Sequence, residues 1–92
     1  MSNLDDIRLE INKCDLELIE LFKKRMSLAK EVANYKFEHD LPIFDKEREA
    51  ELIEKNIKAL DDKELESYYL EWFNTMLKVS KDYQNKIIKE LK

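Results

Sequence analysis

Polar and charged side chains on the apolar stripes of this 92-residue chain could together bind a small anion. Arg25 stands where a regular apolar pattern would place leucine, and Lys36 lies eleven residues further on. In a helix this spacing separates the two residues by only about 20° around the axis and about 16 Å along it, so both cations can reach one ligand. An isolated charge of this kind more often forms a structural ion pair or fixes the register of a helix pair.

Two later segments carry further polar groups. Arg48 and Glu49 lie one turn before the apolar positions of a second stripe, and Ser80 and Gln84 lie one turn apart in a third. Three segments thus direct polar groups toward a side that should be apolar, which favours a small polar pocket inside a helix bundle. These side chains suit an anionic ligand that also carries a hydroxyl group. Arg48 could alternatively be a surface ion-pair partner of Asp45 or Glu49.

A long first helix must position Arg25 and Lys36. Its apolar seam alternates steps of four and three residues, as in a coiled coil. The seam residues are Leu4, Ile7, Ile11, Cys14, Leu18, Leu21, Arg25, Leu28, Val32 and Tyr35. Cys14 is expected to be a small core residue. From Leu4 to Phe37 the helix would be about 50 Å long, more than a small three-helix chain can cover, so we expect a second copy to cover the rest.

Two further helices are predicted after a break at Pro42, which disfavours helix in the residue before it. Asp45 is expected to cap a second helix that ends near Asp61. Asp61 and Glu64 have the spacing of a capping box, which predicts a third helix running to the C-terminus. The chain has no glycine and 41% charged residues, a composition that favours helices over sheets. We predict an all-α fold and one domain over residues 1–92.

Composition excludes several classes of function. Lys and Arg number 17 against 21 Asp and Glu, so neither nucleic acid nor an anionic membrane is an expected partner. No segment has transmembrane length or the pattern of a secretory signal, which predicts a cytoplasmic protein. His39 lacks companions at metal-ligand spacing, and there is no catalytic triad and no glycine-rich phosphate loop. We therefore expect no metal and no cofactor, with catalysis by positioning and electrostatics.

The ordered set of motifs resembles the all-helical chorismate mutases. The motifs are Ile7-Arg8 through Asp15, Arg25 to Ala29, Val32 to Lys36, Pro42-Ile43 with Asp45, Arg48-Glu49, and the late Ser80 and Gln84. The resemblance covers nearly the whole chain. It implies an intertwined homodimer in which three helices per chain form a six-helix bundle with two equivalent sites, and the long first helix spans both subunits.

The resemblance also implies how the two carboxylates of chorismate are bound. Arg8 is about 25 Å from Arg25 along the helix, so one chain cannot bring both to one small molecule. Arg8 would come from the neighbouring subunit, and Arg25 from the subunit that holds the rest of the site. Ser80 and Arg48 would contribute to the polar shell of the substrate.

The remaining implied roles concern the reacting atoms in the rearrangement of chorismate to prephenate, a step of phenylalanine and tyrosine synthesis. Asp45 and Glu49 would meet the ring hydroxyl. Lys36 and Gln84 would donate hydrogen bonds to the ether oxygen whose bond to carbon breaks. The residues expected to act in catalysis are Lys36, Gln84, Arg25 and Glu49.

Two other functions fit the same pattern. One is an isochorismate pyruvate-lyase of the same fold, although Glu49 favours the mutase because a carboxylate is expected to bind the hydroxyl there. The other is a non-catalytic helical dimerisation or regulatory module, in which the inward polar residues are only structural. Pyruvate release from isochorismate would support the lyase. A folded dimer that fails to bind a mimic of the transition state would support the module.

Overall fold

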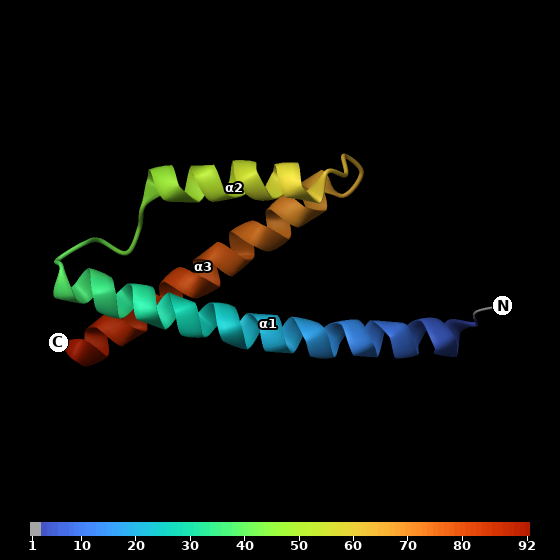
Figure 1. Ribbon diagram of the computed structural model, residues 1–92, viewed down its shortest axis with the longest axis horizontal. Coiled ribbons are helices and arrows are strands. Elements are labelled where there is room, and N and C mark those ends of the chain that lie inside the picture. The colour runs from blue at the N-terminus through green and yellow to red at the C-terminus, as the bar shows by residue number, and fades with distance from the viewer. Residues whose placement is uncertain (1–2) are drawn as a thin grey trace.

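The chain folds into three helices joined by two short connections, as a computed structural model of residues 3–92 shows (Figure 1). They are α1 (Leu4–Glu38), α2 (Lys46–Leu60) and α3 (Glu66–Leu91). The predicted all-α class and the three helices are confirmed. Within residues 3–92, none of these helices combines the length and the apolar content that crossing a membrane requires. The cytoplasmic location stays a prediction.

α1 is one uninterrupted helix of 35 residues. It begins with a reciprocal cap, because the Asn3 side chain accepts from the Asp6 amide at 2.9 Å and the Asp6 carboxylate accepts from the Asn3 amide at 3.4 Å. It ends before His39, where Asp40 takes a left-handed conformation with φ of 53° and Pro42 follows two residues later. The predicted long first helix is therefore present.

α2 begins and ends close to where its sequence pattern predicts. The Asp45 carboxylate accepts from the Arg48 amide at 3.0 Å, the contact of an N-cap. The helix ends at Leu60, and Asp61 caps it in a left-handed conformation with φ of 46°. Asp45 thus has a structural role at the N-terminus of α2 in addition to its place in the candidate site.

The predicted start of α3 at an Asp61–Glu64 capping box is wrong. Asp61 is the left-handed residue that terminates α2, so it cannot also adopt the extended backbone of an N-cap. The helix instead begins at Glu66, after a turn in which the Asp62 side chain accepts from the Leu65 amide at 3.2 Å. The connection between α2 and α3 is therefore longer, by one short turn, than the capping-box pattern predicted.

α3 is the central helix of the chain. It packs against both α1 and α2, whereas α1 and α2 do not pack against each other within residues 3–92 (Figure 1). Its buried residues are Phe73, Leu77, Ser80, Gln84 and Ile87. On α1 the buried residues are Ala29 and Ala33, whose small side chains allow the two helix axes to approach closely.

Ala33→Leu is expected to destabilise the protein by about 1 to 3 kcal/mol, because Ala33 is 0% exposed and the contact has no room for three more carbons. Urea unfolding would measure the loss. Ala50→Leu, at an exposed position of α2, is the matched control and should change stability by less than about 0.5 kcal/mol. Both variants must be compared at one protein concentration, since association contributes to the stability of an oligomer. Equal stability of the two variants would contradict tight α1–α3 packing.

The first half of α1 is uncovered in a single chain. Figure 1 shows it projecting away from the other two helices, and every residue from 4 to 24 is exposed, Cys14 included. The large apolar residues exposed there are Leu4, Ile7, Leu9, Ile11, Leu16, Leu18, Ile19, Leu21 and Phe22. Apolar faces of this extent are typical of interaction surfaces. The extended chain, 57 × 27 × 15 Å, is consistent with an intertwined dimer.

Candidate functional site

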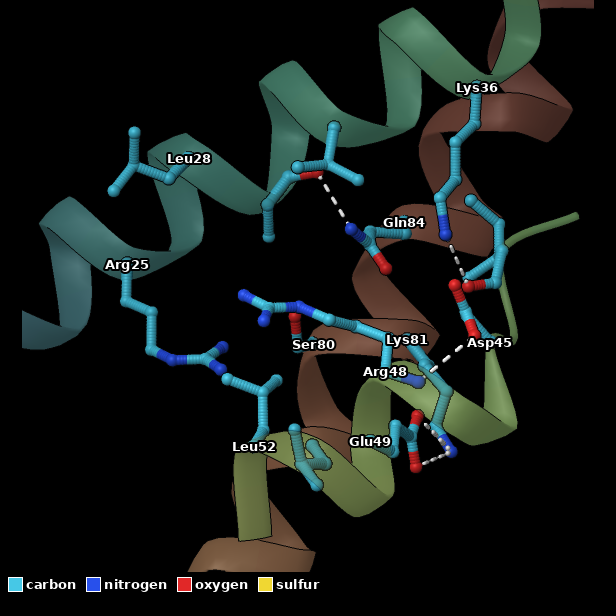
Figure 2. Close-up of a pocket in the computed structure, with 14 residues that line it drawn as sticks. Arg25, Leu28, Lys36, Asp45, Arg48, Glu49, Leu52, Ser80, Lys81 and Gln84 are labelled. Carbon is cyan, nitrogen blue, oxygen red and sulfur yellow. Dashed lines mark hydrogen bonds and ion pairs between the residues drawn. The ribbon is translucent and has the colours of Figure 1, made fainter. Parts of the chain in front are cut away.

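A cavity of about 330 Å³ lies between α1, α2 and α3 (Figure 2). Seven of the eight predicted site residues line it, and Arg8 does not. Its lining comprises Arg25, Leu28, Ala29, Val32 and Lys36 from α1, Ile43 and Asp45 from the connection, Arg48, Glu49 and Leu52 from α2, and Leu77, Ser80, Lys81 and Gln84 from α3. The polar breaks in the three stripes thus meet in one place.

Two guanidinium groups point into this cavity. Arg25 extends from α1 and Arg48 from α2, and Figure 2 shows both side chains reaching into the space between the helices. Neither forms an ion pair with any carboxylate in residues 3–92, so Arg48 is not bound to Asp45 or Glu49 through its guanidinium. Both cations are therefore available to an anionic ligand.

Lys36 and Gln84 are each held by a backbone carbonyl. The Lys36 ammonium donates to the Ile43 carbonyl at 2.9 Å, and the Gln84 amide donates to the Ala29 carbonyl at 3.0 Å (Figure 2). An ammonium has three N–H groups and a side-chain amide has two, so each retains a donor for a ligand. The two contacts orient both side chains before any ligand arrives.

Glu49 is bound to a lysine that the sequence reasoning missed. Lys81 on α3 lies 3.0 and 3.2 Å from the two Glu49 oxygens, and its Nζ lies 4.6 Å from the centre of the Phe44 ring. The available signal was its position three residues before Gln84 and next to Ser80, near the inward face of α3. Because lysine is mostly solvent-exposed in proteins, this spacing alone does not predict a site residue.

The cavity lining combines two buried polar side chains with apolar ones. Ser80 and Gln84 are each only 8% exposed, one turn apart on α3. Apolar side chains line the same cavity: Leu28, Val32, Ile43, Leu52 and Leu77. These apolar residues were not predicted as part of the site, because in sequence they look like ordinary core positions. Of these five residues only Leu77 is buried, whereas Leu28 and Val32 are exposed in the single chain.

Arg8 lies on the exposed first half of α1, away from the cavity of its own chain. It precedes Arg25 by seventeen residues of continuous helix, which is about 25 Å. One chain therefore brings together all the predicted site residues except this one.

The cavity is more positive than the chain as a whole. Four cations and two carboxylates line it, for a formal charge of +2, whereas the whole chain carries −4. The pair formed by Lys81 and Glu49 leaves Arg25, Lys36 and Arg48 as the excess cations. Within residues 3–92, no three His, Cys, Asp or Glu side chains gather in a way that could hold a metal ion. The arrangement is suited to binding a small organic anion and donating hydrogen bonds to it.

Known proteins share this sequence pattern. A family model described as chorismate mutase type II matches residues 7–85. The chain is similar to a T-protein of Haemophilus influenzae, with 44% identity over 54 residues that make up 59% of this chain and 14% of the relative. It is also similar to a bifunctional chorismate mutase/prephenate dehydratase of Aquifex aeolicus, with 38% identity over 58 residues, 63% of this chain and 16% of the relative. The similarity thus spans a small part of each relative, and no solved structure gives a match.

Proposed function

The chain belongs to the chorismate mutase type II family, and from this premise we propose that it is an isomerase that rearranges chorismate to prephenate in phenylalanine and tyrosine synthesis. The observation that carries the proposal is the cavity lined by Arg25, Lys36 and Arg48, none of which forms an ion pair with a carboxylate of residues 3–92. Chorismate is a dicarboxylate with a ring hydroxyl. It is suited to a cavity with an excess of cations and with carboxylates that can accept a hydrogen bond from the hydroxyl. In this proposal residues 1–92 form one domain.

The reaction depends on how the substrate is positioned more than on reactive side chains. The ether carbon–oxygen bond of chorismate breaks while a carbon–carbon bond forms in the same molecule, so no nucleophile and no cofactor take part. The barrier falls when the enolpyruvyl side chain is held over the ring, because rotational freedom is lost on binding instead of in the transition state. Arg25 would bind one carboxylate, and Arg8 of a second copy the other.

Lys36 and Gln84 are proposed to donate hydrogen bonds to the ether oxygen. Negative charge develops on this oxygen as its bond to carbon lengthens, and donors fixed in advance stabilise that charge without reorganising. The Ile43 and Ala29 carbonyls fix these two side chains, which supports the assignment. The Lys36 ammonium and the Gln84 amide each keep a free N–H for the substrate.

The other polar residues are proposed to recognise the rest of the substrate. Asp45 and Glu49 would accept a hydrogen bond from the ring hydroxyl, and Ser80 and Arg48 would complete the polar shell. Asp45 also caps α2, so its replacement would affect the fold as well as the site.

We propose that the active form is an intertwined homodimer. The exposed apolar face of α1 supports it, because a second, antiparallel copy would cover that face. The same arrangement would bring Arg8 of one subunit to the cavity of the other. A dimer would then contain two equivalent sites, each built from both chains.

Purified protein is expected to consume chorismate, measured by ultraviolet absorbance, and to release prephenate as the only product. We expect turnover because the cationic side chains of the cavity bind and orient the substrate. Turnover should therefore persist in the presence of a metal chelator. A folded dimer that leaves chorismate unchanged would refute the proposal. Pyruvate released from isochorismate by that same sample would support the lyase instead.

A further inference from the structure

The ion pair between Lys81 and Glu49 differs from every other ion pair within residues 3–92. The others join residues three or four apart on the surface of one helix, with side chains 63% exposed or more. This one joins α3 to α2 across 32 residues of sequence, and its side chains are 30% and 21% exposed. It lies in the cavity wall (Figure 2).

The geometry fixes the Glu49 carboxylate from one side. The Lys81 ammonium contacts both carboxylate oxygens, at 3.0 and 3.2 Å. An ionised carboxylate has about four acceptor positions, so each oxygen keeps one for a ligand hydroxyl. The Lys81 Nζ also lies 4.6 Å from the centre of the Phe44 ring, within the range of a cation–π contact. The ammonium is thus held by an anion and an aromatic ring at once.

The pair also matters for the other charges in the cavity. A Glu49 side chain without Lys81 could turn toward Arg25 or Arg48 and pair with a guanidinium that the substrate needs. Bound to Lys81, it leaves both arginines free. The second carboxylate, Asp45, is held by the Arg48 amide at the start of α2.

We propose that Lys81 is a positioning residue. It holds the Glu49 carboxylate where that group can accept a hydrogen bond from the ring hydroxyl of the substrate, and it keeps Glu49 away from the arginines. This inference rests on the proposed function, since the hydroxyl belongs to chorismate. Lys81 itself does not touch the substrate and acts through Glu49.

Lys81→Met is expected to lower kcat/KM for chorismate by about ten- to a hundredfold, since a misplaced positioning group can cost up to that much. In a Glu49→Gln background the same substitution should cost less than about twofold, because the group that Lys81 positions is already changed. Lys81→Arg, which keeps the cation, should retain most of the activity. Steady-state kinetics on the four chains of this double-mutant cycle would measure the coupling.

Lys78→Met is the matched control. Lys78 lies three residues earlier on α3 and pairs with Asp82 at 2.8 Å on the exposed surface, so kcat and KM should not change. Circular dichroism and sedimentation would establish that each variant is a helical dimer. Lys81→Gln removes the charge with a more polar side chain and replaces Lys81→Met if the latter does not fold.

The outcomes separate the inference from the function beneath it. A wild-type protein without chorismate turnover refutes the proposed function, and the inference falls with it. An active wild type whose Lys81→Met variant keeps its kcat/KM refutes the inference alone. If Lys81→Met raises KM equally with Glu49 and with Gln at position 49, then Lys81 binds the substrate directly and positioning is wrong.

Discussion

Lys36→Ala is expected to leave a folded helical dimer and to lower kcat by about a hundred- to a thousandfold, the usual cost of removing one donor to a developing negative charge. The Lys36 ammonium is held 2.9 Å from the Ile43 carbonyl at the edge of the cavity, so it is already oriented in the free protein. Chorismate consumption at saturating substrate would measure the loss. Circular dichroism would show that the helices remain.

Lys30→Ala is the control for this prediction. Lys30 is also on α1 but is exposed and does not line the cavity, so its removal should leave turnover unchanged. Near-normal kcat in Lys36→Ala would rule out the proposed role of Lys36. A loss of helicity or of the dimer would instead show that its bond to Ile43 is needed for folding.

A mixture of Arg8→Ala and Arg25→Ala chains is expected to recover about a quarter of wild-type turnover, although each variant alone should lose about a hundredfold or more. Each variant alone leaves a substrate carboxylate without its cation at both sites of the dimer. In a mixed dimer, the Arg8→Ala chain supplies a complete cavity and its partner supplies an intact Arg8. One of the two sites is then whole. Random pairing makes half of the dimers mixed, which yields the quarter.

The experiment requires subunit exchange, for example by unfolding and refolding the two variants together before the assay. A mixture of Arg25→Ala and Lys36→Ala chains is the control, because both residues line the cavity of the same chain. Each site of that mixed dimer lacks one of them, so no recovery is expected. Recovery in the control, or none in the first mixture, would contradict a site shared between subunits.

Local patterns predicted the helices well and one helix start badly. The seam from Leu4 to Tyr35 and the Asp45 cap depend on residues close in sequence, and α1 and α2 occur where those patterns predicted. Asp61 and Glu64 also match a local pattern, but Asp61 has to terminate α2 first. A spacing rule cannot decide which of two neighbouring helices takes a shared residue.

The candidate site likewise contains residues that local patterns predict and contacts that they do not. Polar residues at apolar positions are visible in sequence. Arg25, Ser80 and Gln84 were predicted for that reason, and all three line the cavity. The pair between Lys81 and Glu49 depends on how α3 packs against α2, so no spacing within either helix reveals it. The carbonyl contacts that orient Lys36 and Gln84 were equally invisible, because backbone carbonyls have no sequence signature.

The unbroken length of α1 restricts which changes of chain length the protein can accept. Arg8 and Arg25 are joined by rigid helix alone, without a loop that could absorb an insertion. One inserted residue would turn Arg8 by about 100° relative to Arg25 and advance it by about 1.5 Å. Seven inserted residues would nearly restore the phase of the seam but separate the two arginines by about 10 Å more. If the dimer is built as proposed, α1 sets the distance between the two sites as well as the composition of each.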